Sequence, residues 1–202
     1  AQGKSDELSF SLECMRTQAD NLEEFVHELL DLARSELIDE PSDVESVDVS
    51  AAINHCLQQL SAVIDEHHAQ VIVDCSVSHI NINKTRLGQI LHNLVSNACK
   101  YGSVDNATVT VSAHIVEGQF ELVVADNGKG ISAENQKQLF GLFKRFDPSR
   151  AEGNGLGLSI VKRHVERLGG NISYRDGSPG AQFVVNIHAT EALDQTLLTT
   201  AG

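Results

Sequence analysis

The sequence predicts an α+β fold, a two-layer α/β sandwich in which helices cover one face of a mixed sheet, preceded by a long amphipathic helix. Two strongly helical segments, at 50–67 and 83–101, alternate with apolar runs of strand-like composition. Two β-rich runs, at 107–116 and 120–125, are joined by a short glycine-bearing turn and are typical of a hairpin. Strands mixed with amphipathic helices favour a sheet that is covered on one side.

The leading helix follows from the amino-terminal segment. Apolar residues recur there at three- and four-residue steps from about Asp6 to Ile38, and Pro41 ends the pattern. The stretch 39–47 is polar and acidic and has no period, which is typical of a linker. We therefore expect a long amphipathic helix at 1–40, a linker at 41–48, a globular domain at 49–190 and a flexible tail at 191–202.

The remaining elements of the domain are predicted by the same patterns. Shorter helices are expected at 133–140 and 155–168. Further strands are expected at 70–75, 171–174 and 181–187. The charged, glycine-bearing stretch 144–154 has no period and is typical of a mobile loop.

The composition excludes several classes of partner. Against 28 Asp and Glu the chain has only 15 Lys and Arg, a formal net charge of −13, so we expect no nucleic acid partner and no direct membrane contact. No apolar stretch approaches the roughly 20 residues that cross a bilayer, and we expect the chain to be cytoplasmic, even if a parent protein is anchored in the inner membrane. The 4 cysteines form no C-x-x-C pair and are predicted to be reduced thiols.

One face of the predicted helix at 83–101 carries polar side chains. Asn93, Asn97, Lys100 and Tyr101 lie at i, i+4, i+7 and i+8. Two amides, an ammonium group and a phenol on one face can coordinate a hard cation, neutralise phosphate and cover a ring. A solvated helix face is the alternative that this spacing alone leaves open.

A tight glycine-bearing turn follows the second strand of the hairpin. Asp126 is followed there by Gly128 and Gly130 in a D-x-G-x-G pattern that ends at Ile131. A carboxylate at this point can accept a hydrogen bond from the exocyclic amine of adenine, whereas guanine presents a carbonyl oxygen instead. The alternative is an ordinary β-turn.

A second glycine-rich loop runs from Gly153 to Leu158 into a predicted helix. Such loops present backbone N–H groups and the positive end of a helix to phosphate oxygens. The loop is no Walker A motif, because no Gly-Lys-Ser/Thr follows, and it lacks the acidic residue of a Rossmann fingerprint. A flexible hinge is the alternative.

Taken in order, these segments resemble the ATP-binding domain of the sensor histidine kinases, within the wider family of DNA gyrase, Hsp90 and MutL. The resemblance covers about residues 47–188. Its motifs are an N box at 91–101, a G1 box at 126–131, an F box at 139–147, a G2 box at 153–158 and a terminal glycine turn and strand at 177–183. The resemblance implies the Bergerat ATP-binding fold, with ATP and Mg²⁺ as cofactors.

The resemblance also implies a role for each matching residue. Asn97 would be the Mg²⁺ ligand, and Asn93, Lys100 and Arg145 would be the catalytic residues. The nucleotide would be bound by Asn93, Asn97, Lys100, Tyr101, Asp126, Gly128, Gly130, Ile131, Phe143, Arg145, Gly153, Gly155, Leu156, Gly157 and Leu158. Phe140 and Phe143 are further expected to anchor a lid on the core.

Position 93 distinguishes a kinase from an ATPase. In the gyrase and Hsp90 branch this position of the motif is a glutamate that activates water as a general base. Asn93 cannot accept a proton near neutral pH, so the resemblance implies a γ-phosphate kept for a histidine nucleophile. A GHKL-type ATPase and a non-catalytic nucleotide-binding regulatory module are the alternatives.

The phosphoacceptor motif of the family, the H box, is absent from this sequence. Residues 21–34 instead resemble the second dimerisation helix, so the acceptor histidine is expected upstream of residue 1. His27 precedes Glu28 but lacks the proline of that motif, which favours a helix-surface histidine. The implied partners are a second copy, paired through dimerisation helices in the full-length protein, and a response regulator receiver domain.

Overall fold

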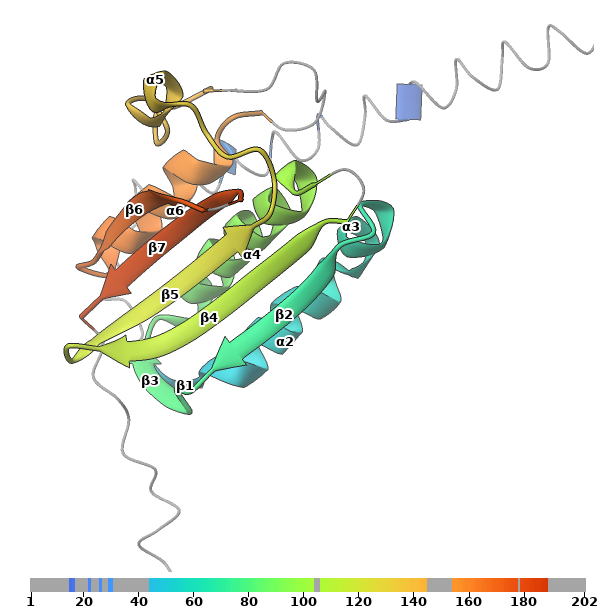
Figure 1. Cartoon of the computed structure of the whole chain (residues 1–202). Helices are drawn as coiled ribbons and strands as arrows, with labels where there is room; N and C mark the ends of the chain where they lie inside the picture. Colours follow the sequence, from blue (N-terminus) through green and yellow to red (C-terminus); the bar gives the residue numbers. More distant parts are fainter. Residues whose placement is uncertain are drawn as a thin grey trace, which may run out of the picture.

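The fold is a five-stranded mixed sheet with helices on one face. The computed structural model describes residues 44–103, 106–144, 154–177 and 179–188, together with Met15, Arg16, Leu22, Val26, Leu29 and Leu30. The sheet has the strand order β2-β4-β5-β7-β6 (Figure 1). Its strands are β2 (Gln70–Cys75), β4 (Thr108–Val116), β5 (Gln119–Asp126), β6 (Asn171–Asp176) and β7 (Ala181–Ile187). Only the β2–β4 pair is parallel, so the predicted mixed sheet is confirmed.

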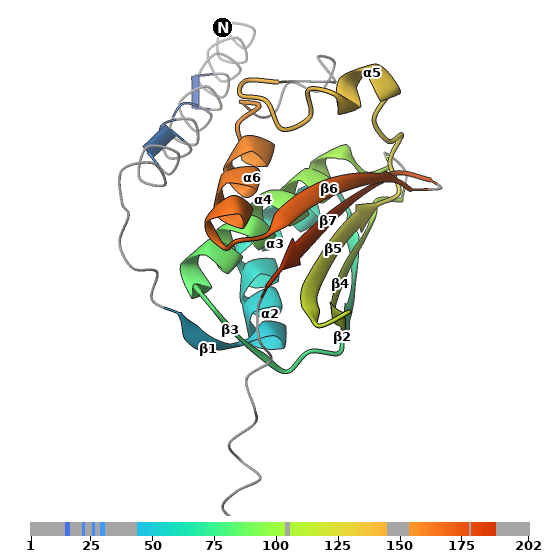
Figure 2. The same ribbon diagram turned by 90° about the vertical axis from the view of Figure 1, so that its left-hand side faces the viewer.

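Three helices lie on the same face of this sheet, as Figure 2 shows from the side. They are α2 (Val49–Gln59), α4 (Lys84–Tyr101) and α6 (Gly157–Arg167). The apolar stripe of α4 is fully buried, and it meets the alternate inward residues of β5, which include Phe120, Leu122 and Val124. Helical and strand periods thus bury their apolar residues in one shared core, and the predicted two-layer sandwich is confirmed.

Local chemistry fixes where the helices begin. The side chain of Asn83 accepts from the backbone N–H of Arg86 at 2.8 Å, and that of Asp48 accepts from Ala51 at 2.8 Å. Both are N-cap residues that satisfy an otherwise unpaired donor of the first turn. The predicted hairpin also forms, with Glu117 and Gly118 at positive φ values of 51° and 77° between β4 and β5.

Two helix predictions were wrong, and a strand lies where none was predicted. The helix expected at 50–67 is divided at Leu60 into α2 and α3 (Ser61–Glu66), because Leu60 turns into the core while α3 buries none of its residues fully. The helix expected at 133–140 keeps only α5 (Ala133–Gln136), and turns follow it so that Leu139 enters the core. The predicted linker contains a strand, β1 (Glu45–Asp48).

The strand β1 pairs antiparallel with β3 (His79–Ile82), which the sequence did not predict either. Their buried residues Val47, Ile80 and Ile82 close one end of the core beneath α2 and α4. Two four-residue strands give almost no periodic signal, and their pairing spans more than thirty positions of the sequence. The pairing is therefore a property of the tertiary fold.

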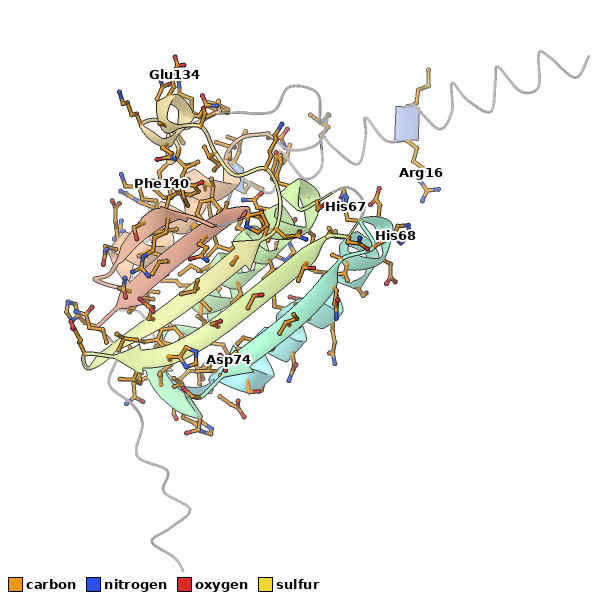
Figure 3. The ribbon with its side chains drawn as sticks, viewed as in Figure 1. Arg16, His67, His68, Asp74, Glu134 and Phe140 are labelled. Carbon is orange, nitrogen blue, oxygen red and sulfur yellow. The ribbon has the colours of Figure 1, made fainter. Side chains whose placement is uncertain are left out.

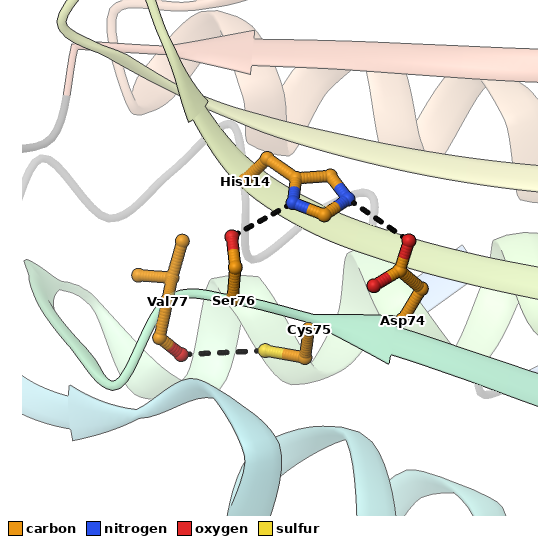
Figure 4. A network of polar contacts seen from close by, with 5 residues as sticks. All are labelled: Asp74, Cys75, Ser76, Val77 and His114. Atoms are coloured by element: carbon orange, nitrogen blue, oxygen red, sulfur yellow. Dashed lines mark hydrogen bonds and ion pairs between the residues drawn. The ribbon is translucent and has the colours of Figure 1, made fainter.

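The open face of the sheet carries a polar network that lies away from the helices (Figure 4). His114 on β4 contacts Ser76 Oγ through Nδ1 at 2.8 Å and Asp74 Oδ2 through Nε2 at 3.4 Å. Asp74, also labelled in Figure 3, is on the edge strand β2, and Ser76 follows that strand. These contacts connect the edge strand to its neighbour.

The described cysteines form no disulfide, and two of them are buried. Cys56, Cys75 and Cys99 are free cysteines, as predicted. Burial raises the pKa of Cys56 to about 12 and that of Cys99 to about 11, so both remain protonated near neutral pH.

Among the residues that the structure describes, no helix is both long enough and apolar enough to cross a bilayer.

Candidate nucleotide-binding site

A large cavity of about 1360 Å³ opens at one end of the sandwich. Its walls come from the polar face of α4, the turn after β5, the start of α6 and the turn between β6 and β7. These segments meet at the end of the sheet that α5 overhangs (Figures 1 and 2). Of the residues predicted for the site, the lining includes Asn93, Asn97, Lys100, Tyr101, Asp126, Gly128, Gly130, Ile131, Gly155, Gly157 and Leu158.

Asp126 is the last residue of β5 and is only 8% exposed. Its Oδ1 accepts from the backbone N–H of Gly128 at 2.8 Å and from that of Ala181, the first residue of β7, at 3.3 Å. These donors come from its own turn and from the neighbouring strand, so they fix the carboxylate in one orientation. The carboxylate lines the cavity.

The glycines around Asp126 are required by close backbone approaches. A Cβ built on Gly128 would lie 2.1 Å from the carbonyl oxygen of Tyr101. A Cβ on Gly180, whose φ is +98°, would lie 1.8 Å from the carbonyl oxygen of Asp126. Gly130 has a φ of +68° and approaches the carbonyl of Gly180. Only glycine lets these backbone segments lie so close together.

Asn127 braces the same turn, a role that the sequence did not reveal. Its Oδ1 accepts from the N–H of Ser103 at 3.1 Å and of Thr108 at 2.9 Å, and its Nδ2 donates to the carbonyl of Asn106 at 2.6 Å. The side chain therefore joins the end of β5 to the connection between α4 and β4. Its position inside the D-N-G pattern was the signal, because Asn bonds readily to nearby backbone in turns.

The amides of Asn93 and Asn97 face the start of α6. Asn93 Nδ2 donates to the carbonyl of Gln89 at 2.9 Å, which directs Oδ1 away from its own helix. A Cβ built on Gly157 would lie 2.9 Å from Asn93 Oδ1 and 3.7 Å from Asn97 Nδ2. Glycine at this position keeps space open beside both amides.

Lys100 and Tyr101 follow on the same face of α4, at the carboxyl end of the helix, and both line the cavity. The four polar residues of the predicted constellation therefore share one wall. Asp126, at the end of β5, lines the same cavity, so its wall carries a carboxylate as well as two amides and an ammonium group. The arrangement can accept a ligand that has a hydrogen-bond donor at one end and an anion at the other.

Two further predicted residues that the structure describes, Phe143 and Leu156, do not line the cavity. Phe143 is 57% exposed. Leu156 is fully buried. Phe140, labelled in Figure 3, packs against the core, whereas Phe143 does not. Arg145 and Gly153 lie outside the described residues.

The two ends of the loop at 145–153 lie next to each other. A Cβ built on Gly155, whose φ is +72°, would lie 2.8 Å from the backbone nitrogen and the carbonyl oxygen of Lys144. Lys144 and Gly155 both line the cavity. The described residues on either side of 145–153 therefore meet at the cavity, and the mobile loop expected at 144–154 lies largely outside the described residues.

The cavity also has walls that the sequence analysis did not include. Asp176, Pro179 and Phe183 line it from the β6–β7 side. On the other side it continues along α4 past His92 towards His55 of α2. The signal for this extension was the helical spacing upstream of Asn93. Pro179 and Phe183 belong to the terminal glycine turn and strand at 177–183, to which no ligand contact was assigned.

Comparisons with known proteins agree with this geometry. Residues 82–191, more than half of the chain, match the family "Histidine kinase-, DNA gyrase B-, and HSP90-like ATPase". The chain is 32% identical over 174 residues to sensor histidine kinase ZraS of Escherichia coli (strain K12), which covers 85% of this chain. The chain spans only 35% of the length of that relative.

Solved structures share the fold. Histidine kinase AdeS of Acinetobacter baumannii superposes with a TM-score of 0.73 at 23% identity, covering 89% of this chain and 83% of its own. Full-length ShkA, solved in complex with AMPPNP, superposes with a TM-score of 0.75 at 25% identity, covering 89% of this chain and 38% of its own. The chain therefore belongs to the histidine kinase-, DNA gyrase B- and HSP90-like ATPase family, and it carries an ATP-binding catalytic domain of the sensor histidine kinase type.

Proposed function

We propose that this chain is the catalytic part of a two-component sensor histidine kinase. It binds Mg-ATP and transfers the γ-phosphate to a histidine on a dimerisation helix, from which the phosphate passes to an aspartate of a response regulator. The observation that carries the proposal is the single cavity that joins the buried carboxylate of Asp126 to the amides of Asn93 and Asn97 and to Lys100.

In this proposal the adenine base lies at the end of the cavity where Asp126 stands. Two backbone donors hold Oδ1, so the carboxylate keeps a fixed direction in which it can accept from the exocyclic amine of adenine. The glycine turn beside it leaves room for the flat ring, because no Cβ stands at Gly128 or Gly130. Guanine would set its carbonyl oxygen against the carboxylate, so we expect the site to select ATP over GTP.

The phosphates are placed between α4 and the start of α6. Lys100 supplies positive charge, and the glycines at 155 and 157 let backbone N–H groups approach the phosphate oxygens. We expect Arg145 and Gly153 to act on the same phosphates. Tyr101 is expected to cover the nucleotide from the end of α4.

The donor chemistry of α4 fits Mg²⁺. Amide oxygens are hard ligands of the kind this ion prefers, and Asn97 lies beside the space that Gly157 leaves open. Asn97 would hold the ion together with phosphate oxygens, and when bound the ion would neutralise phosphate charge. Within the described part of the chain, no cluster of three His, Cys, Asp or Glu side chains is arranged to hold a metal.

Asn93 favours phosphotransfer over hydrolysis. Its amide donates to Gln89 and cannot take a proton from water, so the site lacks the general base that an ATPase of this family uses. In the proposed reaction a ring nitrogen of the acceptor histidine forms a bond to Pγ, the bond from Pγ to the bridging oxygen breaks, and ADP leaves with the electron pair. Positioning and electrostatics supply the catalysis.

The acceptor and the partners belong to the parent protein. We expect residues 1–40 to be one helix of a dimerisation bundle, residues 41–48 to link it to the catalytic domain at 49–190, and residues 191–202 to form a tail. A homodimer through those helices and a response regulator receiver domain are the expected partners, in the cytoplasm. The length of relatives such as ZraS leaves room for these further segments.

Radiolabelled phosphotransfer tests the function directly. The chain is incubated with γ-labelled ATP, Mg²⁺ and a separately made acceptor helix that carries an H box. We expect a labelled acceptor whose label is lost in acid and kept in base, as a phosphoramidate of histidine requires. Steady release of phosphate without any labelled protein would instead favour the GHKL-type ATPase, and failure to bind Mg-ATP in calorimetry would favour a regulatory module.

Replacing Asn97 by Ala separates metal ligation from nucleotide binding. We expect Asn97→Ala to lower Mg-dependent phosphotransfer about ten- to a hundredfold, because one ligand of the ion is lost. The affinity for nucleotide measured in EDTA is expected to change less than threefold, or about 0.6 kcal/mol. Equal losses in both measurements would count against the metal role. Ser96→Ala, at the neighbouring position of the cavity wall, is the matched control.

A further inference from the structure

The backbone N–H and the backbone carbonyl of Ile131 are each held by a side chain from outside the glycine turn. Its N–H donates to the hydroxyl of Tyr174 at 3.1 Å, and its carbonyl accepts from Gln136 Nε2 at 2.8 Å. Both side chains converge on a third residue, since Tyr174 donates to Asp176 Oδ1 at 2.8 Å and Gln136 Nε2 lies 3.3 Å from the same oxygen. We call these four residues the Ile131 clamp.

The donors and acceptors of the clamp match one another. The hydroxyl of Tyr174 accepts one hydrogen bond and donates one, and the two amide hydrogens of Gln136 go to two different oxygens. Burial, together with the neighbouring Asp176, raises the pKa of Tyr174, which keeps the hydroxyl protonated as this pattern needs. The network is therefore stable as a unit near neutral pH.

The clamp stands at the wall of the nucleotide cavity. Ile131 and Asp176 both line it. The ring of Tyr174 packs edge to face on Phe183, with centroids 5.9 Å apart, and Phe183 lines the cavity as well. Tyr174 itself does not line the cavity, so it can act on a ligand only through the residues that it holds.

The turn before Ile131 needs such a constraint. Gly130 has a φ of +68° and no side chain, so this part of the backbone has wide conformational freedom by itself. The clamp fixes it from β6 on one side and from α5 on the other. The backbone of Ile131 therefore has a fixed position in the cavity wall, at the end where Asp126 lies, and α5 is attached to it through Gln136.

We propose that Tyr174 and Gln136 are positioning residues for the nucleotide base. By holding the backbone of Ile131 they set the distance between the glycine turn and the β6–β7 wall, and they join the placement of α5 to base binding. The proposal rests on the proposed function, because it takes the ligand of the cavity to be an adenine nucleotide with its base beside Asp126.

Two conservative variants test the clamp by calorimetry with Mg-ATP and Mg-ADP. Tyr174→Phe removes the hydroxyl and keeps the ring on Phe183, and Gln136→Ala removes the second contact. We expect each to weaken binding about five- to tenfold, the effect of about one hydrogen bond to a preorganised wall. ATP and ADP should weaken by the same factor, because the clamp lies away from the phosphates. Gln138→Ala, an exposed neighbour of α5, is the matched control and should bind as the unaltered chain does.

Two further measurements distinguish a positioning role from a general loss of stability. They are the affinity of the double variant and the hydrogen exchange of the Ile131 amide. Because both side chains hold the backbone of one residue, the double variant is expected to lose less affinity than the product of the two single losses. In amide hydrogen exchange, protection of Ile131 should fall in Tyr174→Phe and stay unchanged in Gln138→Ala. Gln136→Ala decides the question if Tyr174→Phe does not fold.

The outcomes separate this proposal from the function on which it rests. If the unaltered chain binds Mg-ATP and both clamp variants bind it as tightly, the positioning role is wrong and the proposed function stands. A loss for ATP without an equal loss for ADP would also overturn it, since the effect would then lie at the γ-phosphate. If the unaltered chain does not bind Mg-ATP, the proposed function fails, and the clamp proposal fails with it.

Discussion

Asp126→Asn is expected to weaken Mg-ATP binding about a hundredfold, the cost of replacing a charge-assisted hydrogen bond by two opposed donors. The N–H groups of Gly128 and Ala181 determine how the new side chain must lie. They require an acceptor, so the amide oxygen takes the place of Oδ1 and the NH₂ group faces the ligand. That group then meets the exocyclic amine of adenine as a donor against a donor.

Isothermal titration calorimetry with Mg-ATP and Mg-GTP measures this effect. The same NH₂ group can donate to the carbonyl oxygen of guanine, so the preference for ATP over GTP should narrow or reverse in the variant. The fold should be kept, because the amide oxygen still accepts from both N–H groups. Asp74→Asn on the open face of the sheet is the matched control (Figure 4). An ATP affinity within threefold of the unaltered chain, or about 0.6 kcal/mol, would exclude Asp126 as the adenine reader.

Gly128→Ala is expected to be a strongly damaging single-methyl change in the site. Its Cβ would lie 2.1 Å from the carbonyl oxygen of Tyr101 and 2.9 Å from Asp126 Oδ1. The first neighbour is backbone and cannot rotate away, so the turn or the end of α4 must shift. We expect a loss of about 3 kcal/mol in the free energy of unfolding, at the upper end for overpacking, and at least a tenfold loss of Mg-ATP affinity as Asp126 moves.

Urea denaturation and calorimetry check this prediction against a second glycine. Gly88, in the middle of α4, has no atom within 4 Å of where its Cβ would stand. Gly88→Ala should therefore raise the free energy of unfolding by about 0.5–1 kcal/mol through helix propensity alone. If the two variants were equally stable, the close approach at Gly128 would have no energetic consequence, and the stated need for glycine would be wrong.

Local patterns in the sequence predicted the main elements of the fold. The 3.6-residue period identified α4, and its boundaries came within one residue because Asn83 is an N-cap of a common type. The alternating runs of β4 and β5 and the turn between them gave the hairpin. Periodicity failed where elements are short, as with β1 and β3, since four residues cannot establish a period.

The candidate site was predicted in part for the same reason. Spacing on one helix placed Asn93 and Asn97 on a shared face, and the structure puts both at the cavity. Phe143 was expected at the nucleotide but is exposed, because the position of a side chain on a loop depends on contacts that no local pattern records. The residues that hold the glycine turn, Asn127 and Tyr174, were missed in the same way.

By itself the sequence determined the two-layer architecture, the polar face of α4, the carboxylate of Asp126 and the family to which the chain belongs. Only the tertiary structure decided that Asp126 accepts from Ala181, 55 residues away, and that Tyr174 and Gln136 hold the backbone of Ile131. The physical reason is that the period of a helix or strand depends on residues that are close in sequence. A hydrogen bond between distant segments, in contrast, forms only after the shared core has brought those segments together.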